Sequence, residues 1–298
     1  MQIVIVGGSG FVGQHLAKRL LAAGHEVWIP TRGSHSVPHG QTISYKLNEM
    51  GALLSKLKSP YAIVNLAGES INSGRWTAKR KEAILQSRLE VTHTIVRAIK
   101  ASEQKPEVLI NASAIGFYGY SNTATFTESS PSGHGFLADV TREWEQAASK
   151  AAPHTRVVLA RLGVVLGANG GALPRMVLPY YGWIGGRVGS GRQLLSWIHI
   201  DDVAGIIEHC LTDQRIHGPV NVTAPEPITM DQFGRKISQT LHRPHWLAVP
   251  SFALKFLLGE MAEIVLQGQF VLPQVMQSYG YTFTYPTADQ ALQEIYKK

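Results

Sequence analysis

A short β-branched run, a glycine-spaced turn and a helical pattern open the chain, and their order constrains the fold more than any other feature. The run covers Gln2 to Val6, the turn Gly7 to Gly13, and the helical pattern Phe11 to Ala23. Strand, tight turn and helix in this order are typical of a dinucleotide-binding βα unit. Glycines let the backbone approach a pyrophosphate, which then lies at the positive end of the helix dipole. The alternative is a glycine-rich loop without a ligand.

The end of the second strand indicates which dinucleotide such a unit would bind. This strand runs over Glu26–Ile29 and ends at Thr31 and Arg32. The residue just past the strand lies beside the adenosine ribose, where a carboxylate would bind the 2′-hydroxyl and an arginine would pair with a 2′-phosphate. Arg32 therefore favours NADP(H) over NAD(H), against the alternative of a solvated surface arginine.

Buried strands alternate with helices along the first half of the chain. We expect strands near 42–45, 61–68, 108–113 and 155–161, and helices over 50–57, 77–100 and 136–152. The alternation predicts an α/β fold with a Rossmann-type doubly wound parallel sheet and a smaller C-terminal substrate lobe. We place the NADP-binding domain at 1–160, completed by parts of 195–225, and the lobe at 161–298. Within the lobe, the glycine-rich composition of residues 163–191 favours lobes and binding loops over a parallel sheet.

Two further helices are expected in the second half. Asp201 and Asp202 precede an apolar pattern that runs to Leu211, and Thr229 precedes one that runs to Leu241. Residues of these types commonly cap helix N-termini because their side-chain oxygens accept from free backbone N–H groups. We therefore expect the two aspartates and Thr229 to act as caps, with His199 orienting the start of the first of these helices.

Composition limits the kinds of partner. Mean hydropathy is −0.02 and 44% of residues are hydrophobic, and no apolar run reaches the roughly 18 residues that span a bilayer. We expect a cytoplasmic protein with no membrane partner. The single cysteine, Cys210, lies in an apolar pattern and is expected to be a buried thiol, and no cluster predicts a metal site. The net charge of +7 comes without any basic, aromatic-interleaved module, so we expect no nucleic-acid partner.

Several motifs resemble landmarks of a known family, the extended short-chain dehydrogenase/reductases, which include nucleotide-sugar epimerases and dehydratases. They are Val6–Gly13 (VGGSGFVG), Asn65–Gly68 (NLAG), Ser113 with Phe117–Gly119, and Ile198–Ala204 (IHIDDVA). More narrowly, Gly68–Ile71, Arg75–Thr77, Ser87–Arg88 and the region 250–298 resemble the atypical "epimerase family protein" branch. That branch ends in a small C-terminal domain of unknown function.

The turn and the resemblance together imply a set of cofactor contacts at the carboxyl edge of the sheet. These are Gly7, Gly8, Ser9, Gly10, Phe11, Val12, Gly13, Thr31, Arg32, Leu66, Ala67, Gly68, Arg88 and Ser113. The implied cofactor is NADP(H), and the implied partner is a small molecule with a carbonyl or sugar-like group. The resemblance also suggests a homodimer through the helices 77–100 and 136–152.

The catalytic residues of the extended family are absent. Its members use a Tyr-x-x-x-Lys pair, in which the lysine lowers the pKa of the tyrosine that moves the proton. Aligning the helix through Trp144–Glu145 puts Phe136 or Leu137 at the tyrosine position and Val140 or Thr141 at the lysine position. No Tyr-x-x-x-Lys sequence occurs elsewhere in the chain.

Replacement groups for proton transfer can still be named. Ser113 and Tyr118 are the candidate catalytic residues, and Tyr120, Glu69 and His199 are further possibilities. The alternative for Tyr118 is packing in the loop after its strand, and for Ser113 a hydroxyl that satisfies backbone groups.

Two functions therefore stay open. The first is an NADP(H)-dependent oxidoreductase or epimerase-like enzyme, and the second is an NADPH-binding sensor or regulatory protein without turnover.

Overall fold

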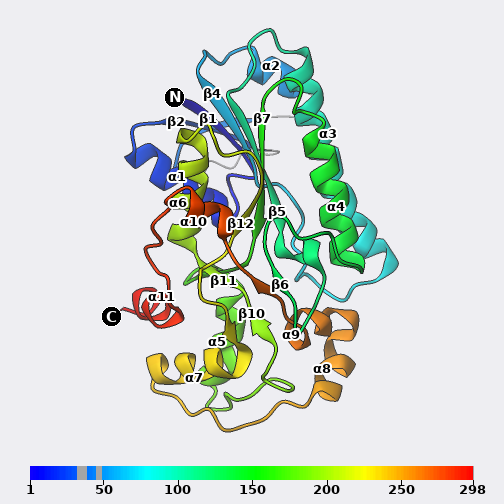
Figure 1. The fold of residues 1–298 in the computed structure, drawn as a ribbon, viewed down its shortest axis with the longest axis vertical. Helices are drawn as coiled ribbons and strands as arrows, with labels where there is room; N and C mark the ends of the chain where they lie inside the picture. The colour runs from blue at the N-terminus through cyan, green and yellow to red at the C-terminus, as the bar shows by residue number, and fades with distance from the viewer. Residues whose placement is uncertain (32–38, 45–48, 298) are drawn as a thin grey trace.

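A seven-stranded parallel sheet forms the upper part of the molecule in the computed structural model, which describes residues 1–31, 39–44 and 49–297 (Figure 1). Its strand order is β12-β7-β5-β4-β1-β2-β3. The strands are β1 (Gln2–Val6), β2 (Glu26–Thr31), β3 (Gln41–Ser44), β4 (Tyr61–Asn65), β5 (Val108–Ala114), β7 (Arg156–Leu162) and β12 (Gly218–Val222). This order confirms the predicted Rossmann-type doubly wound sheet.

The strand order reverses at β1. The chain steps outward from β1 through β2 to β3, then returns to place β4 on the other side of β1, with Val6 opposite Asn65. In open α/β sheets, ligands bind beyond the carboxyl ends of the strands at such a switch point. The Gly7–Gly13 turn and the exit of β4 both lie at this edge, which we call the crevice edge.

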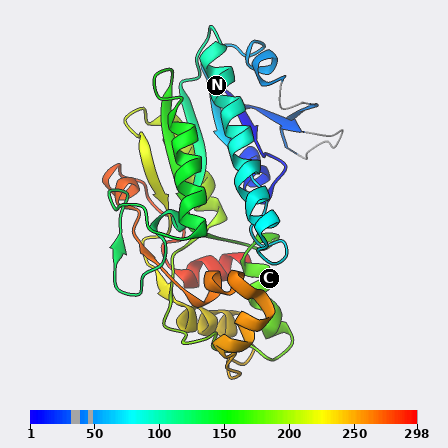
Figure 2. The same ribbon diagram turned by 90° about the vertical axis from the view of Figure 1, so that its right-hand side faces the viewer.

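Helices cover both faces of the sheet (Figures 1 and 2). Helices α1 (Phe11–Ala22) and α6 (Ile200–Thr212) pack on one face, where Leu16, Leu20 and Val203 meet β1 and β2. Helices α2 (Met50–Leu54), α3 (Ala78–Ala101) and α4 (Phe136–Ser149) pack on the other. The strands are buried from both sides, which accounts for their continuous apolar sequences.

Parts of the second half of the chain build a smaller lobe below the crevice edge with its own apolar core, which includes Trp197 and Phe233. Its elements are β8 (Val164–Gly167), β9 (Gly170–Gly171), α5 (Leu173–Tyr181), β10 (Leu194–Leu195), β11 (Trp197–His199), β13 (Ile228–Thr229), α7 (Met230–Leu241), α8 (Ser251–Leu258), η3 (Gly259–Ala262), α9 (Glu263–Leu266), β14 (Phe270–Val271) and α11 (Ala288–Ile295). The short elements η2 (Ile115–Tyr118) and β6 (Thr125–Phe126) follow β5, and β6 pairs with β14. Helix α10 (Gln274–Ser278) packs against β12, with Met276 in the core of the sheet. Residues 163–191 belong to this lobe and stay outside the seven-stranded sheet, but they are more regular than loops alone, since α5 and a β8–β9 hairpin lie within them and β8 pairs in parallel with β11.

One helix start differs from its prediction. The cap of α6 is His199, whose ring accepts from the backbone N–H of Asp201 at 3.2 Å. The Asp202 carboxylate instead accepts from the backbone N–H groups of Thr284 and Tyr285, at 2.8 and 2.9 Å. It is fully buried and anchors the C-terminal segment, so the expectation that Asp201 and Asp202 cap the helix was wrong.

Two other local predictions are confirmed. Thr229 caps α7 in a capping box with Gln232, and Cys210 is a buried free thiol.

Among the helices that the structure describes, none has both the length and the apolar character needed to cross a bilayer.

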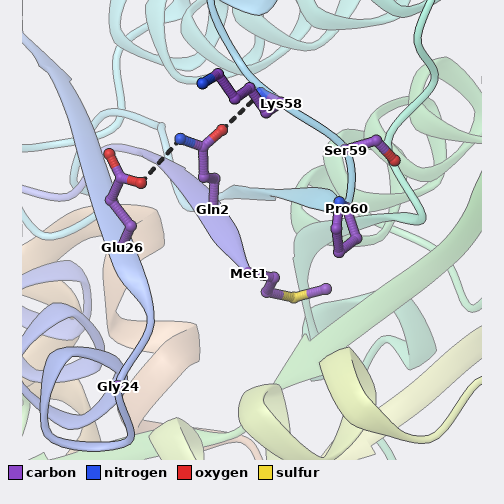
Figure 3. Close-up of a pocket in the computed structure, with 7 residues that line it drawn as sticks. All are labelled: Met1, Gln2, Gly24, Glu26, Lys58, Ser59 and Pro60. Carbon is purple, nitrogen blue, oxygen red and sulfur yellow. Dashed lines mark hydrogen bonds between the residues drawn. The ribbon is translucent and has the colours of Figure 1, made fainter.

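A shallow hollow lies at the opposite edge of the sheet, at the amino ends of β1 and β2 (Figure 3). Gln2 links its two walls: its amide donates to Glu26 at 2.8 Å and accepts from the backbone N–H of Lys58 at 2.7 Å. Because ligands in this type of sheet bind at the carboxyl ends, the hollow is not the candidate site.

Candidate functional site

The glycine turn leaves no room for side chains on its inner side. A Cβ on Gly7, which has φ +84°, would lie 2.8 Å from the backbone of Leu66 and Ala67, and one on Gly13 would lie 2.5 Å from the Gly7 carbonyl oxygen. A Cβ on Gly8 would overlap Ile29 at 2.7 Å. These three glycines are therefore required by close packing between the turn, β2 and the exit of β4.

Gly10 differs from its neighbours because it faces outward. It is exposed, and a Cβ there would meet only the Gly7 carbonyl oxygen, at 3.3 Å. Gly10 is also the N-cap of α1 and provides no side-chain cap, and exposed Ser9 precedes it. The N–H groups of Phe11, Val12 and Gly13 belong to the first helical turn, where no intrahelical acceptor exists. The turn thus offers a bare backbone surface at a helix N-terminus, which fits the diphosphate of a dinucleotide.

Phe11 joins this turn to the lower lobe. Its ring packs against the β8–β9 hairpin so closely that a Cβ on Gly167 or Gly170 would lie 2.6 or 2.5 Å from ring atoms. The hairpin glycines are therefore needed to seat an aromatic side chain. This contact fixes the first residue of α1 relative to the lobe.

The exit of β4 forms the second wall. Leu66 donates its backbone N–H to Val6 at 2.8 Å, and the N–H of Ala67 binds the Asn65 side chain at 3.2 Å. Gly68 lies against Arg88 of α3, so closely that a Cβ would be 3.1 Å from the guanidinium carbon. The predicted contacts Leu66, Ala67 and Gly68 thus lie next to the glycine turn, with Arg88 immediately behind them.

Arg88 forms no direct ion pair with a carboxylate among the residues that the structure describes, although the charge of nearby Glu69 acts on it. Its guanidinium donates to the Ile84 carbonyl at 2.8 Å and lies 5.0 Å from the Trp144 ring centroid. Burial lowers the pKa of Arg88 to about 10, so the side chain stays protonated near neutral pH. A half-buried cation at the crevice edge is suited to an anionic ligand group.

Ser113 lies in a buried polar network. Its hydroxyl donates to Glu145 Oε1 at 2.7 Å, and Arg161 binds both oxygens of the same carboxylate at 2.8 Å each. Only 2% of Ser113 is exposed. The single O–H of this serine is thus used inside the protein, where it orients the Glu145 carboxylate.

Tyr118 belongs to the same network. Its hydroxyl donates to Asn221 Oδ1 at 2.7 Å and accepts from Arg161 at 2.8 Å, and 2% of the residue is exposed. Burial raises the pKa of Tyr118, although the charge of Arg161 opposes this effect. The hydroxyl would have to break two hydrogen bonds to serve a substrate. A catalytic role for Ser113 or Tyr118 stays a prediction.

The positions of the missing Tyr and Lys carry groups without acid–base chemistry. Leu137 packs in an apolar cluster with Trp76, Ile84 and Val140. The Thr141 hydroxyl donates to the Leu137 carbonyl at 2.8 Å. The first turns of α4 therefore present an apolar wall to the crevice.

The C-terminal region closes this wall from below. Arg75 donates to the carbonyls of Phe256 and Leu257 at the end of α8, at 2.9 and 3.0 Å, and Lys81 forms an ion pair with Glu260. Arg175 of α5 donates to the Asn72 carbonyl at 3.0 Å. These arginines tie the loop after β4 to the lobe, a role that sequence reasoning missed because the partners are backbone carbonyls far along the chain.

Thr31 ends β2 on the adenosine side of the turn. Arg32 lies outside the described residues, so its pairing with a 2′-phosphate stays a prediction. In the part of the chain that the structure describes, no group of three or more His, Cys, Asp or Glu side chains could hold a metal ion.

Together, the reversed strand order, the outward-facing Gly10 and the bare N-terminus of α1 define a dinucleotide-binding α/β protein. Residues 3–222 match the model of the NAD dependent epimerase/dehydratase family, and residues 249–295 match a domain of unknown function (DUF1731). The chain therefore belongs to the NAD-dependent epimerase/dehydratase family, which confirms the resemblance seen in its motifs.

Relatives match along nearly the whole chain. The epimerase family protein YfhF of Bacillus subtilis is 44% identical over 99% of this chain and 98% of its own length. The chloroplastic SDR39U1 homologue of Arabidopsis thaliana is 41% identical over 99% of this chain and 86% of its own length. A crystal structure of human epimerase family protein SDR39U1 (isoform 2) with NADPH superimposes with a TM-score of 0.91 at 36% identity, covering 100% of this chain and 99% of that one.

Proposed function

We propose that this protein binds NADP(H) at the crevice edge and transfers hydride between the nicotinamide and a small carbonyl or sugar-like substrate. The observation that carries the proposal is the glycine turn, whose outward side at Gly10 is open while its inner side is fully packed. The human relative was crystallised with NADPH, which supports NADP(H) rather than NAD(H). Arg32, which follows Thr31 in the sequence, supports the same choice.

Each wall of the crevice has a role in this proposal. The N-terminus of α1 would hold the diphosphate, and Arg88, which lies against Gly68 at the exit of β4, would be available to an anionic group of the ligand. The apolar wall of Leu137, Trp76 and Val140 excludes water from the substrate side. When bound, the nicotinamide supplies the hydride chemistry.

A proton must still be moved. Among the candidates from the sequence, Glu69 is the accessible one: 45% of its side chain is exposed, and it directly follows Gly68 at the crevice edge. It is paired with Arg80, and its backbone N–H binds the Ser87 hydroxyl at 3.1 Å. We propose Glu69 as the group that holds the substrate proton, and Ser113 and Tyr118 as residues that shape the wall behind it.

One observation favours a second function, an NADPH-binding protein without turnover. Leu137 and Thr141 occupy the acid–base positions of α4 with an apolar side chain and a hydroxyl bound to its own helix. A protein that only senses NADPH needs the glycine turn but no proton donor.

Calorimetry with a pair of glycine variants tests cofactor binding. Gly10→Ala places a methyl group on the face that a diphosphate would approach, so NADPH affinity should fall by roughly 1–3 kcal/mol, the usual effect of overpacking. Gly51→Ala is the matched control, because a Cβ there meets nothing within 4 Å. Equal NADPH binding by both variants would show that the turn does not hold the cofactor. Arg32→Asp should weaken NADPH much more than NADH.

Isotope transfer separates the two functions. The protein is incubated with NADPH carrying deuterium at the nicotinamide C4 and a small-molecule extract, and products are analysed by mass spectrometry. Transfer of deuterium to a metabolite supports the enzyme. Glu69→Gln should lose this transfer, whereas the control Glu82→Gln, on the exposed side of α3, should retain it. Tight NADPH binding with no transfer supports the sensor.

A further inference from the structure

Large apolar side chains are exposed together at the lower end of the molecule. Trp183 is 56% exposed, Trp246 68%, Phe252 75% and Phe256 85%. Leu178, Tyr181, Ile184, Leu247 and Leu257 belong to the same two segments and are also exposed. We call residues 178–187 and 246–257 the apolar tip. Exposed apolar side chains scattered singly are ordinary, whereas a cluster of this kind marks a contact surface.

Backbone hydrogen bonds hold the two segments side by side. The N–H groups of Trp246 and Val249 donate to the carbonyls of Gly185 and Arg187, at 2.9 and 2.8 Å. The indole of Trp246 donates to the Trp183 carbonyl at 2.9 Å. Pro250 then leads directly into α8, so both segments lie at the lower end of the lobe (Figures 1 and 2).

Two features show that the exposure is built into the fold. Trp183 has φ +62°, a left-handed conformation that bulky residues rarely adopt, and the surrounding hydrogen bonds hold it there. In α8, Leu254 and Leu258 face the protein, while Phe252, Lys255 and Phe256 share the outward face by their spacing of three and four residues. A helix that is apolar on its outward face as well needs an apolar environment on that side.

Charge indicates which environment this is. Residues 163–200 and 242–259 contain no aspartate or glutamate, yet they contain Arg187, Arg192, Arg243 and Lys255. The Arg243 guanidinium lies 4.4 Å from the Trp183 ring centroid. Three carboxylates border the tip, and each of the first two already has a cationic or histidine partner: Asp231 binds His245 and Arg235, Glu260 is paired with Lys81, and the third is Glu263. A symmetric pairing of two tips would bring the arginines and Lys255 of one copy close to those of the other, which disfavours a second copy as the partner.

We propose that the apolar tip docks onto the surface of a lipid bilayer that carries anionic headgroups. Tryptophan and phenylalanine rings enter the boundary between headgroups and acyl chains, and the arginines and Lys255 pair with headgroup phosphates. The contact is peripheral and needs no spanning helix. It departs from the expectation of no membrane partner, which considered only spanning segments, and it is independent of the proposed cofactor chemistry.

Vesicle binding tests the proposal with the full chain. The probes are phosphatidylcholine vesicles with and without roughly one-third phosphatidylglycerol, an anionic lipid. We expect sedimentation with the anionic vesicles and a blue shift of tryptophan emission. Trp183 and Trp246 are the exposed indoles, while Trp76, Trp144 and Trp197 are buried, so the shift reports the tip. Trp183→Phe/Trp246→Phe should abolish the shift and retain sedimentation.

Matched variants locate the contact. Phe252→Ser/Phe256→Ser should abolish sedimentation, and Lys255→Glu should weaken it at least about fivefold. Leu21→Ser changes an exposed leucine on α1, in the sheet domain, and should have no effect. As a control for folding, all of these variants should bind NADPH with the affinity of the wild type.

Three results would overturn the proposal. They are sedimentation equal in all variants, no sedimentation by the folded wild type, and a dimer in light scattering that Phe252→Ser/Phe256→Ser dissociates.

Discussion

At the scale of single residues, the buried carboxylate of Glu145 organises the interior behind the crevice. It accepts two hydrogen bonds from Arg161 and one from Ser113, and Arg161 extends the network to Tyr118 and Asn221. A buried ion pair is tolerated only when hydrogen bonds satisfy its remaining polar atoms. Ser113 and Tyr118 provide these bonds, which explains why hydroxyl side chains occur there whether or not the protein turns over a substrate.

A pair of tyrosine variants tests this structural role. Tyr118→Phe leaves Asn221 Oδ1 and an Arg161 N–H without their partner, and it should reduce the free energy of unfolding by about 1–3 kcal/mol. Tyr120→Phe is the matched control, because the buried Tyr120 hydroxyl has no hydrogen-bond partner among the residues that the structure describes. Urea unfolding measures both. If Tyr118→Phe keeps full stability but loses deuterium transfer, Tyr118 is catalytic.

At the scale of elements, the start of α6 depends on the protonation of one histidine. The His199 ring accepts from the Asp201 N–H, so its Nδ1 must be unprotonated. Burial lowers the pKa of His199 below its ordinary value of 6.5. His199 therefore binds a proton at higher pH in the unfolded chain than in the folded chain. The free energy of unfolding should fall as the pH drops below about 6.5. Asp201, whose pKa is lowered mainly by its hydrogen bond with His15, loses its contribution only at more acidic pH.

His199→Asn tests this dependence, because asparagine caps helices without titrating. Between about pH 7.5 and about pH 5.5 the wild type should lose roughly 1 kcal/mol more stability than the variant. Chemical unfolding at both pH values measures the difference. Identical losses would mean that His199 does not titrate in this range. His25, whose pKa is also lowered by burial, is present in both proteins and cancels.

At the scale of the whole molecule, the sheet domain and the lobe meet at the glycine turn. Phe11 seats in the β8–β9 hairpin, and Arg175 and Arg75 bind carbonyls across the crevice edge. The shape of the cofactor site therefore depends on the lobe, although every expected diphosphate contact belongs to the first thirteen residues.

A double-mutant cycle between Phe11 and Gly170 measures this coupling. Gly170→Ala places a methyl group 2.5 Å from the Phe11 ring and should destabilise the protein by about 1–3 kcal/mol. In the background of Phe11→Ala the same change should have little effect, because the overlapping ring is gone. Stability is measured by thermal unfolding, with NADPH affinity as a second readout. If the two changes in stability simply add, then the packing of Gly170 against Phe11 does not couple the hairpin to the turn.

Local pattern in the chain was enough to predict the structural features that depend only on residues close together in the sequence. The β-branched runs, the glycine turn and the periodicity of α1, α3 and α4 specify a doubly wound sheet, because strand and helix periods are local properties. The cap of α7 at Thr229 followed in the same way.

The contacts between side chains far apart in the sequence became known from the tertiary structure alone. Ser113 binds Glu145, Phe11 fills the space above Gly170, Asp202 anchors the C-terminal segment instead of capping α6, and the rings of α8 remain uncovered. None of these follows from local pattern, because each depends on how distant elements pack. A serine, a phenylalanine or an aspartate has the same local propensity whether its partner lies in the site or in the core.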